Sequence, residues 1–125
     1  MTKQAIATRA APSPAGAYSQ GIQAGGFVFV AGQAGVDPIT GQLVGESVEE
    51  QTSQALRNVE AILASAGLGL GHLVATTAYL ADMNLFARYD EAYRRLVPDP
   101  LPARATVGAQ LQGILIEISA IAVHD

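Results

Sequence analysis

Glu117 stands out because it interrupts a strongly apolar segment near the C-terminus. It directly follows Ile114-Leu115-Ile116 in a run of residues with high β propensity. A carboxylate in such surroundings must be paired, hydrated or protonated. One interpretation is a solvent-facing residue on an edge strand, but the neighbours on the same strand face, Leu115, Ile121 and Val123, favour a recessed position. A recessed carboxylate is suited to moving protons as a general acid or base.

Arg104 is the second residue whose type and setting point to chemistry. It follows Leu101-Pro102-Ala103, a stiff segment with few backbone donors, and it begins a β-rich run. The guanidinium is a planar fork that matches the two oxygens of a carboxylate. A single arginine in a loop is most often simply solvated. Because the two C-terminal segments can pair as strands, we expect Arg104 and Glu117 to lie near each other, either as a functional pair or as a simple salt bridge.

Local signals mark the elements that must position these residues in the first half of the chain. Gly25-Gly26 predicts a two-residue hairpin turn between strands over 19–24 and 27–31. Ser47-Val48-Glu49-Glu50 is a capping box, and the apolar residues behind it recur at helical spacing. We therefore predict a helix over 48–66 that Gly67 ends.

The second half repeats this order and then adds strands. A strand is predicted over 74–80, and Asn84 can cap a second helix. That helix carries one apolar stripe, made of Phe86, Tyr89, Ala92, Tyr93 and Leu96. Two strands over 105–110 and 114–123 finish the chain, and one more strand can precede the hairpin. The order predicts an α+β fold in which both helices pack on one face of the sheet.

The composition indicates a single domain over residues 1–125 that associates with copies of itself. Half of the residues are hydrophobic and only 14% are charged, against about 25% charged in a typical soluble domain. A lone subunit of 12.9 kDa has few charges with which to cover its surface. A second copy of the chain is the usual cover for an additional apolar face. We therefore expect a homo-oligomer.

The residue counts also exclude several classes of function. Seven basic and eleven acidic residues give a net charge of −4 and no basic patch for nucleic acid. The chain has no cysteine, and His72 and His124 are too few to form a metal site without it. No stretch approaches the roughly 18 apolar residues of a membrane span. We expect a soluble, cytoplasmic protein with no metal, membrane or nucleic-acid partner.

Nine short motifs along the chain carry a resemblance to a known family. They are Ala11-Pro12, Gly16-Ala17-Tyr18-Ser19-Gln20, Phe29-Val30-Ala31-Gly32-Gln33, Asp37-Pro38, Thr40-Gly41, Glu50-Gln51-Thr52, Asn58-Val59, Pro102-Ala103-Arg104 and Ile116-Glu117-Ile118. In this order they resemble the RidA (YjgF) enamine/imine deaminase family nearly end to end. The resemblance implies a chorismate-mutase-like α+β fold and a homotrimer with a site in each cleft between subunits.

The same resemblance implies an activity and a set of site residues. The expected activity is cofactor-free hydrolysis of reactive 2-enamine and 2-imino acids, such as 2-aminoacrylate, 2-iminobutanoate and 2-iminopropanoate, to 2-oxo acids and ammonia. Arg104 matches the arginine that binds the substrate carboxylate, and Glu117 matches the glutamate that positions water. Tyr18, Ala31 and Gly32 match residues that line the ligand.

Two positions differ from the best-known members of that family. Thr106 stands where many members have cysteine, and Asp90 stands where some have asparagine; both are expected to contact the substrate. Three alternatives stay open at this point. They are a non-catalytic or regulatory trimer that binds small carboxylates, a dedicated catabolic deaminase, and a ribonuclease. The combination of Arg104 with Glu117 favours catalysis, because a protein that only binds carboxylates does not need both.

The charge balance makes the ribonuclease alternative testable. Nucleic-acid binding depends on clustered Lys and Arg that release counterions, and this chain scatters seven basic residues among eleven acidic ones. We predict no appreciable binding of single-stranded RNA at about 0.15 M salt, measured by fluorescence anisotropy. Binding that weakens steeply with salt, or RNA cleavage that an Arg104 variant abolishes, would contradict this prediction.

Overall fold

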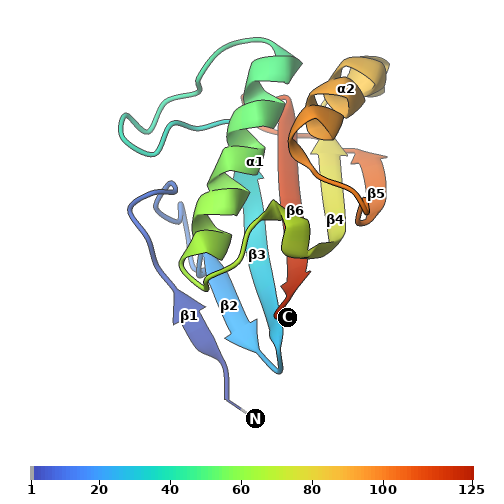
Figure 1. The fold of residues 1–125 in the computed structure, drawn as a ribbon. Helices are drawn as coiled ribbons and strands as arrows, with labels where there is room; N and C mark the ends of the chain where they lie inside the picture. The colour runs from blue at the N-terminus through green and yellow to red at the C-terminus, as the bar shows by residue number, and fades with distance from the viewer. Residues whose placement is uncertain (1) are drawn as a thin grey trace.

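Two helices cover one face of a six-stranded sheet in the computed structural model, which describes residues 2–125 (Figure 1). The strands lie side by side in the order β1-β2-β3-β6-β4-β5. They are β1 (Gln4–Ile6), β2 (Gly21–Ala24), β3 (Phe27–Ala34), β4 (Leu73–Leu80), β5 (Ala103–Gly108) and β6 (Ile116–Val123). The helices are α1 (Val48–Ala64) and α2 (Phe86–Leu96), and short 3-10 turns span Leu70–His72 and Met83–Leu85.

The pairing of the two C-terminal strands differs from the expectation. β6 lies in the interior of the sheet between β3 and β4 and is antiparallel to both. β5 pairs in parallel with the other edge of β4, so the prediction that β5 pairs with β6 is wrong. The physical reason is the connection through α2, which returns the chain to the same end of the sheet and so makes β5 parallel to β4.

The local signals of the first half are largely confirmed. Gly25 and Gly26 have φ of 58° and 82°, and the hairpin they form pairs Ala24 with Phe27. The backbone N–H of Glu50 donates to Ser47 Oγ at 3.1 Å, which starts α1 at the expected residue. The helix ends at Ala64, two residues earlier than predicted, and the additional N-terminal strand is present as β1.

The start of α2 differs from the prediction, because Asp82 rather than Asn84 supplies the capping oxygen. Asp82 Oδ1 accepts a hydrogen bond from the backbone N–H of Asn84 at 2.9 Å, which begins a 3-10 turn ahead of the helix. α2 itself begins at Phe86 without a side-chain cap. β5 begins earlier than predicted, at Ala103, because its pairing with β4 extends to that residue.

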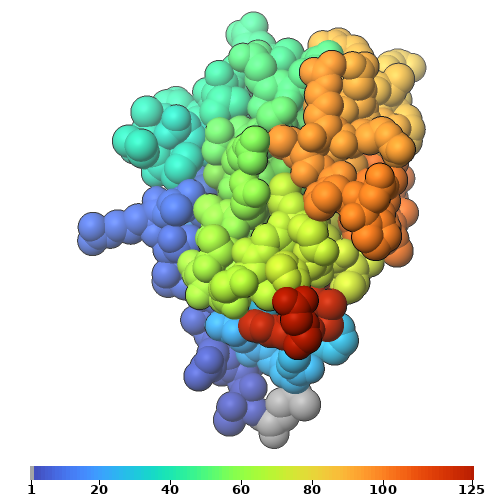
Figure 2. All heavy atoms as spheres, viewed as in Figure 1, coloured from blue at the N-terminus to red at the C-terminus, as the bar shows by residue number. Residues whose placement is uncertain are grey.

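The core lies between the helices and one face of the sheet. β6 alternates strictly, and its buried residues face the helices: Ile116, Ile118, Ala120 and Ala122. The apolar stripe of α1 meets them with Leu56, Val59, Ile62 and Leu63, all fully buried. The prediction that both helices pack on one face is confirmed, and in the space-filling view they hide most of the sheet (Figure 2).

The other face of the sheet carries no helix. Phe27 and Phe29 of β3 are each 42% exposed there, with ring centroids 6.2 Å apart. Register pairs Phe29 with Ile121 and Phe27 with Val123, so the apolar surface continues onto β6. We call this surface, formed by the four residues just named, the open face. Neither helix within residues 2–125 has the length and apolar character needed to cross a membrane.

Three buried side-chain amides tie the long loops to the sheet and to α1. Gln20 Nε2 donates to the carbonyls of Thr8, Ala11 and Pro12, at 2.8 to 3.2 Å. Gln51 Nε2 donates to the carbonyl of Gly45, and its Oε1 accepts from the N–H of Leu115. Asn58 Nδ2 donates to the carbonyls of Ala34 and Val36 at 3.1 and 2.9 Å. These amides fix loop backbone that would otherwise leave buried carbonyls unpaired.

Asn58→Ala tests how much this tethering contributes to stability. The change removes two hydrogen bonds to carbonyls beneath α1, and Asn58 is only 1% exposed. We expect a loss of about 2 to 4 kcal/mol in the free energy of unfolding by urea. The control is Arg57→Ala, which removes a solvent-exposed ion pair with Glu60 one residue away and should cost less than about 1 kcal/mol. Equal stability of the two variants would show that the tether contributes little.

Candidate functional site

A cleft of about 540 Å³ opens on the face of the sheet opposite the helices. Its walls come from the N-terminal loop, which brings Pro12, Ser13, Ala15 and Tyr18, and from the loop over 36–41 that follows β3. Its floor includes Gly32, Ala34 and the carboxylate-bearing Glu117. The hydroxyl of Tyr18 accepts a hydrogen bond from the N–H of Ala15 at 3.0 Å, which fixes the ring at the mouth. Glu117 is the only acidic residue among the lining residues.

A β-bulge makes room for the Glu117 side chain. Register places Val30 opposite Ala120 and Gln33 opposite Ile118, so two residues of β3, Ala31 and Gly32, face a single residue of β6. A Cβ atom on Gly32 would lie 2.5 Å from Glu117 Oε2. Glycine at this position therefore lets the carboxylate lie directly over the backbone. Ala31 instead uses its N–H to bond the Gln20 carbonyl at 2.9 Å.

Arg104 lies among three aromatic rings of α2. Its guanidinium carbon is 4.7 Å from the ring centroid of Tyr93, 5.2 Å from that of Tyr89 and 5.6 Å from that of Phe86. Such contacts hold a cation by cation–π attraction. One nitrogen, Nη1, lies 2.8 Å from Asp90 Oδ1, and the arginine side chain is 21% exposed. We call Arg104 with these three rings the arginine box.

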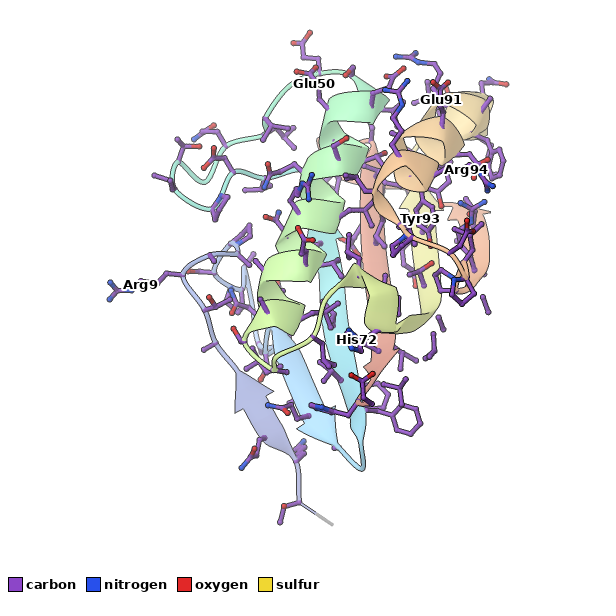
Figure 3. The ribbon with its side chains drawn as sticks, in the orientation of Figure 1. Arg9, Glu50, His72, Glu91, Tyr93 and Arg94 are labelled. Carbon is purple, nitrogen blue, oxygen red and sulfur yellow. The ribbon has the colours of Figure 1, made fainter. Side chains whose placement is uncertain are left out.

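Hydrogen bonds order the tyrosines of the arginine box. Tyr93 Oη and Thr76 Oγ1 lie 2.7 Å apart beneath α2, and Tyr89 Oη and Thr106 Oγ1 lie 3.2 Å apart (Figure 3 labels Tyr93). Burial raises the pKa of both phenols above the ordinary tyrosine value. The rings therefore stay neutral at physiological pH. Thr106 contributes its hydroxyl to this network.

The arginine box and the cleft lie on opposite faces of the sheet. Thr76 bonds Tyr93 of α2, so its side chain is on the helix side, and Arg104 is its register partner in β5. Tyr79 stands three residues further along β4 and is the register partner of Glu117. Side chains alternate along a strand and register partners share a face. Arg104 and Glu117 of one chain therefore point away from each other.

The predicted site residues thus fall into two groups. Tyr18, Gly32 and Glu117 line the cleft, whereas Arg104, Asp90 and Thr106 form the second group around α2 and β5. Ala31, which was also predicted to line the ligand, lies in the bulge and is not among the residues that line the cleft. The expectation that Arg104 and Glu117 of the same chain meet is wrong, because β4 separates their strands and strand alternation separates their faces. Glu117 is nevertheless not an edge-strand residue, since β6 is interior.

The rings of the arginine box belong to the predicted apolar stripe of α2, but their contact with Arg104 was not among the predictions. A usable signal was their spacing: Phe86, Tyr89 and Tyr93 recur at three and four residues, so they share one helix face. The 36–41 loop was also missed as a cleft wall. Within residues 2–125 the structure brings together no group of three or more side chains suited to hold a metal ion.

Comparison with known proteins places this architecture in a family. The family model described as Endoribonuclease L-PSP matches residues 8–124. The chain belongs to the RidA (YjgF) family. This RidA-family chain is 45% identical to a RutC family protein of Pyrococcus horikoshii over 125 residues, covering 98% of this chain and 99% of the relative.

Other members of the RidA family carry more specific names. The 2-iminobutanoate/2-iminopropanoate deaminase of Mus musculus is 43% identical over 124 residues, covering 98% of this chain and 92% of the mouse protein. Among solved structures, Escherichia coli TdcF with bound serine superposes with a TM-score of 0.92 at 35% identity, covering 98% of this chain and 99% of TdcF. The sheet with two helices on one face is thus the RidA-family fold.

Gly32→Ala tests the packing of glycine against the carboxylate in this RidA-family cleft. The new Cβ would collide with the end of the Glu117 side chain, which is flexible and can swing aside. We expect a crystal structure of the variant to have the carboxylate displaced from residue 32, at a stability cost below about 2 kcal/mol. Gly69→Ala is the control, because a Cβ there meets no atom within 4 Å. An unmoved carboxylate would contradict the contact.

Proposed function

We propose that this protein hydrolyses 2-imino acids, and the enamines that tautomerise to them, to 2-oxo acids and ammonia. The observation that carries the proposal is the pair of chemically complementary half-sites: a held guanidinium on one face of the sheet and a carboxylate in a cleft on the other. The substrates in view are 2-iminobutanoate and 2-iminopropanoate, for which the mouse relative is named. The TdcF structure with bound serine supports a small amino-acid-like ligand.

Arg104 would bind the carboxylate of the substrate. The aromatic rings and Asp90 hold the guanidinium in one orientation before any ligand arrives. Fixing the reacting molecule in this way removes much of the entropic cost of the reaction. The hydroxyl of Thr106, held by Tyr89, lies in the same half-site. This half-site can orient a 2-imino acid. Its carboxylate, Asp90, is already paired with Arg104 and is therefore not available to accept a proton.

Glu117 would supply the proton transfers. A water molecule attacks the C=N carbon while Glu117 accepts its proton, the C–O bond forms, and the π electron pair moves to nitrogen, which takes up a proton. The hydroxyl of the resulting carbinolamine then passes its proton by way of Glu117 to the amine nitrogen, the C–N bond breaks, and ammonia leaves as the C=O bond forms. One water is consumed, and one 2-oxo acid and one ammonia are produced. The reaction needs no oxidant or reductant.

A second copy of the chain would complete the site. Because the two halves lie on opposite faces of the sheet, two different surfaces must meet, which is a heterologous contact. Heterologous contacts form a closed ring when the rotation between subunits closes, and the family resemblance implies a ring of three. The apolar open face, with Phe27 and Phe29 each 42% exposed, is suited to line the inside of such a ring.

Substitutions should separate the two roles. Arg104→Lys keeps the charge but loses the planar fork, so we expect kcat/KM for 2-iminobutanoate to fall roughly 30- to 1,000-fold.

Glu117→Gln keeps the shape but cannot accept a proton, so kcat should fall about 100-fold or more while carboxylate binding persists. Ammonia release from enzymatically generated imino acid, corrected for the buffer reaction, is the measurement.

The control for Arg104→Lys is Arg95→Lys, which alters an exposed ion pair with Glu91 on α2. It should retain full activity. An Arg104→Lys variant that matches the parent would refute the carboxylate clamp and the function with it. Ligand binding by the parent without ammonia release above buffer would instead favour the non-catalytic binding protein.

Mixing the two inactive variants tests the shared site. Arg104→Lys subunits carry an intact Glu117, and Glu117→Gln subunits carry an intact Arg104. After a 1:1 mixture is unfolded and refolded, each of the two subunits that form a site has an even chance of carrying the intact residue needed there. About a quarter of the sites should therefore combine both intact residues. We expect about a quarter of the parent activity, with light scattering reporting a trimer. Activity no higher than the mean of the two pure variants would contradict a site built by two subunits.

A further inference from the structure

Asp90 forms an ion pair with the guanidinium of Arg104, the group that the proposed function assigns to binding of the substrate carboxylate. Its Oδ1 lies 2.8 Å from Arg104 Nη1, and the two side chains are 45% and 21% exposed. The other arginine–carboxylate pairs within residues 2–125 lie on the surface, with arginine side chains 54% to 72% exposed. The Arg104–Asp90 pair is thus the one held against aromatic rings.

This pairing changes the charge that a ligand meets. A guanidinium alone would present one positive charge, whereas the guanidinium with Asp90 is neutral overall. Burial by itself lowers the pKa of Arg104, but the hydrogen bond to Asp90 and the attraction of Tyr89, Asp90 and Tyr93 outweigh burial and raise it, so the arginine stays charged. Asp90 is the only carboxylate among these groups. Any ligand carboxylate that binds Arg104 must therefore approach the carboxylate of Asp90.

The substrate and product of the proposed reaction differ in charge at this position. A 2-imino acid protonated on nitrogen carries a positive charge two bonds from its carboxyl carbon, and its net charge is zero. The 2-oxo acid product has an uncharged oxygen at that position and a net charge of −1. A neighbouring carboxylate attracts the first molecule and repels the second.

We propose that Asp90 makes the Arg104 half-site selective for zwitterionic carboxylates over simple carboxylate anions, so that the iminium substrate is favoured over the 2-oxo acid product. The inference rests on the proposed function for the identity of the ligands, and on the Arg104–Asp90 pair for the selection itself. Asparagine at this position would keep the hydrogen bond to Nη1 but remove the charge, and with it the discrimination. Asp90 is in this view a residue that determines specificity, and no proton passes through it.

The test compares two stable ligands that have the same carbon skeleton and different net charges. Isothermal titration calorimetry measures Kd for 2-oxobutanoate, an anion, and for 2-aminobutanoate, a zwitterion, with the parent protein and with Asp90→Asn. We expect Asp90→Asn to bind 2-oxobutanoate about 10- to 100-fold more tightly than the parent does. Binding of 2-aminobutanoate should stay within about threefold or weaken, so the ratio of the two Kd values changes at least about tenfold.

Glu91→Gln is the matched control, because it removes the same charge from the adjacent residue. Glu91 pairs with Arg95 on the exposed side of α2, with its side chain 68% exposed (Figure 3). Its effect on either Kd should be below about twofold, because solvent screens it from Arg104. Thermal unfolding and light scattering establish that each variant keeps its fold and assembly.

Each outcome decides the inference. If Asp90→Asn changes both Kd values by the same factor, Asp90 only positions Arg104 and the charge selection is refuted. Weaker binding of 2-oxobutanoate by the variant, or no binding of either ligand by parent and variant, refutes it as well. A changed Kd ratio in a protein that releases no ammonia would uphold the selection and refute the deaminase function. An unchanged Kd ratio in a protein that does release ammonia would refute the charge selection and uphold the deaminase function.

Discussion

The alternation of side chains along β6 is the constraint on which the rest of the structure depends. Because β6 is interior, its even-numbered residues from Ile116 to Ala122 must be apolar to fill the core beneath the helices. Glu117 is thereby forced to the opposite face. The register of β4 then places Arg104 on the helix side. Placing Glu117 on the helix side beside Arg104 would put its carboxylate among the core residues of β6, which is costly.

The loops around the site are held by neutral amides. Gln20, Gln51 and Asn58 each carry donors and an acceptor, and they bond backbone groups of the loops that surround the cleft. An amide does not titrate, so these tethers persist across a pH range in which carboxylate or imidazole tethers would be lost. Their burial also explains how a chain without cysteine keeps long irregular segments in place.

The sequence predicted the features that depend on neighbours in the chain. The Gly25-Gly26 turn and the Ser47 cap follow from the backbone conformations and hydrogen bonds that those residue types favour locally. The sequence did not predict the partner of β5. This strand pairs with β4 because the chain crosses over through α2 and because β6 lies between β3 and β4, and no local sequence pattern indicates either arrangement. The contact of Arg104 with Asp90, fourteen residues earlier, was missed for the same reason.

On the proposed assembly, association and chemistry depend on the same surfaces. In this proposal the arginine box would bind a carboxylate but has no free proton acceptor, whereas the cleft has a carboxylate that can accept a proton but no cation among its lining residues. Each half alone therefore does little with an imino acid in water. The low fraction of charged residues and the exposed phenylalanines of the open face would favour this association through the hydrophobic effect. Burial of that face would thus stabilise the oligomer and, in the same step, place the carboxylate of one subunit against the substrate held by the next.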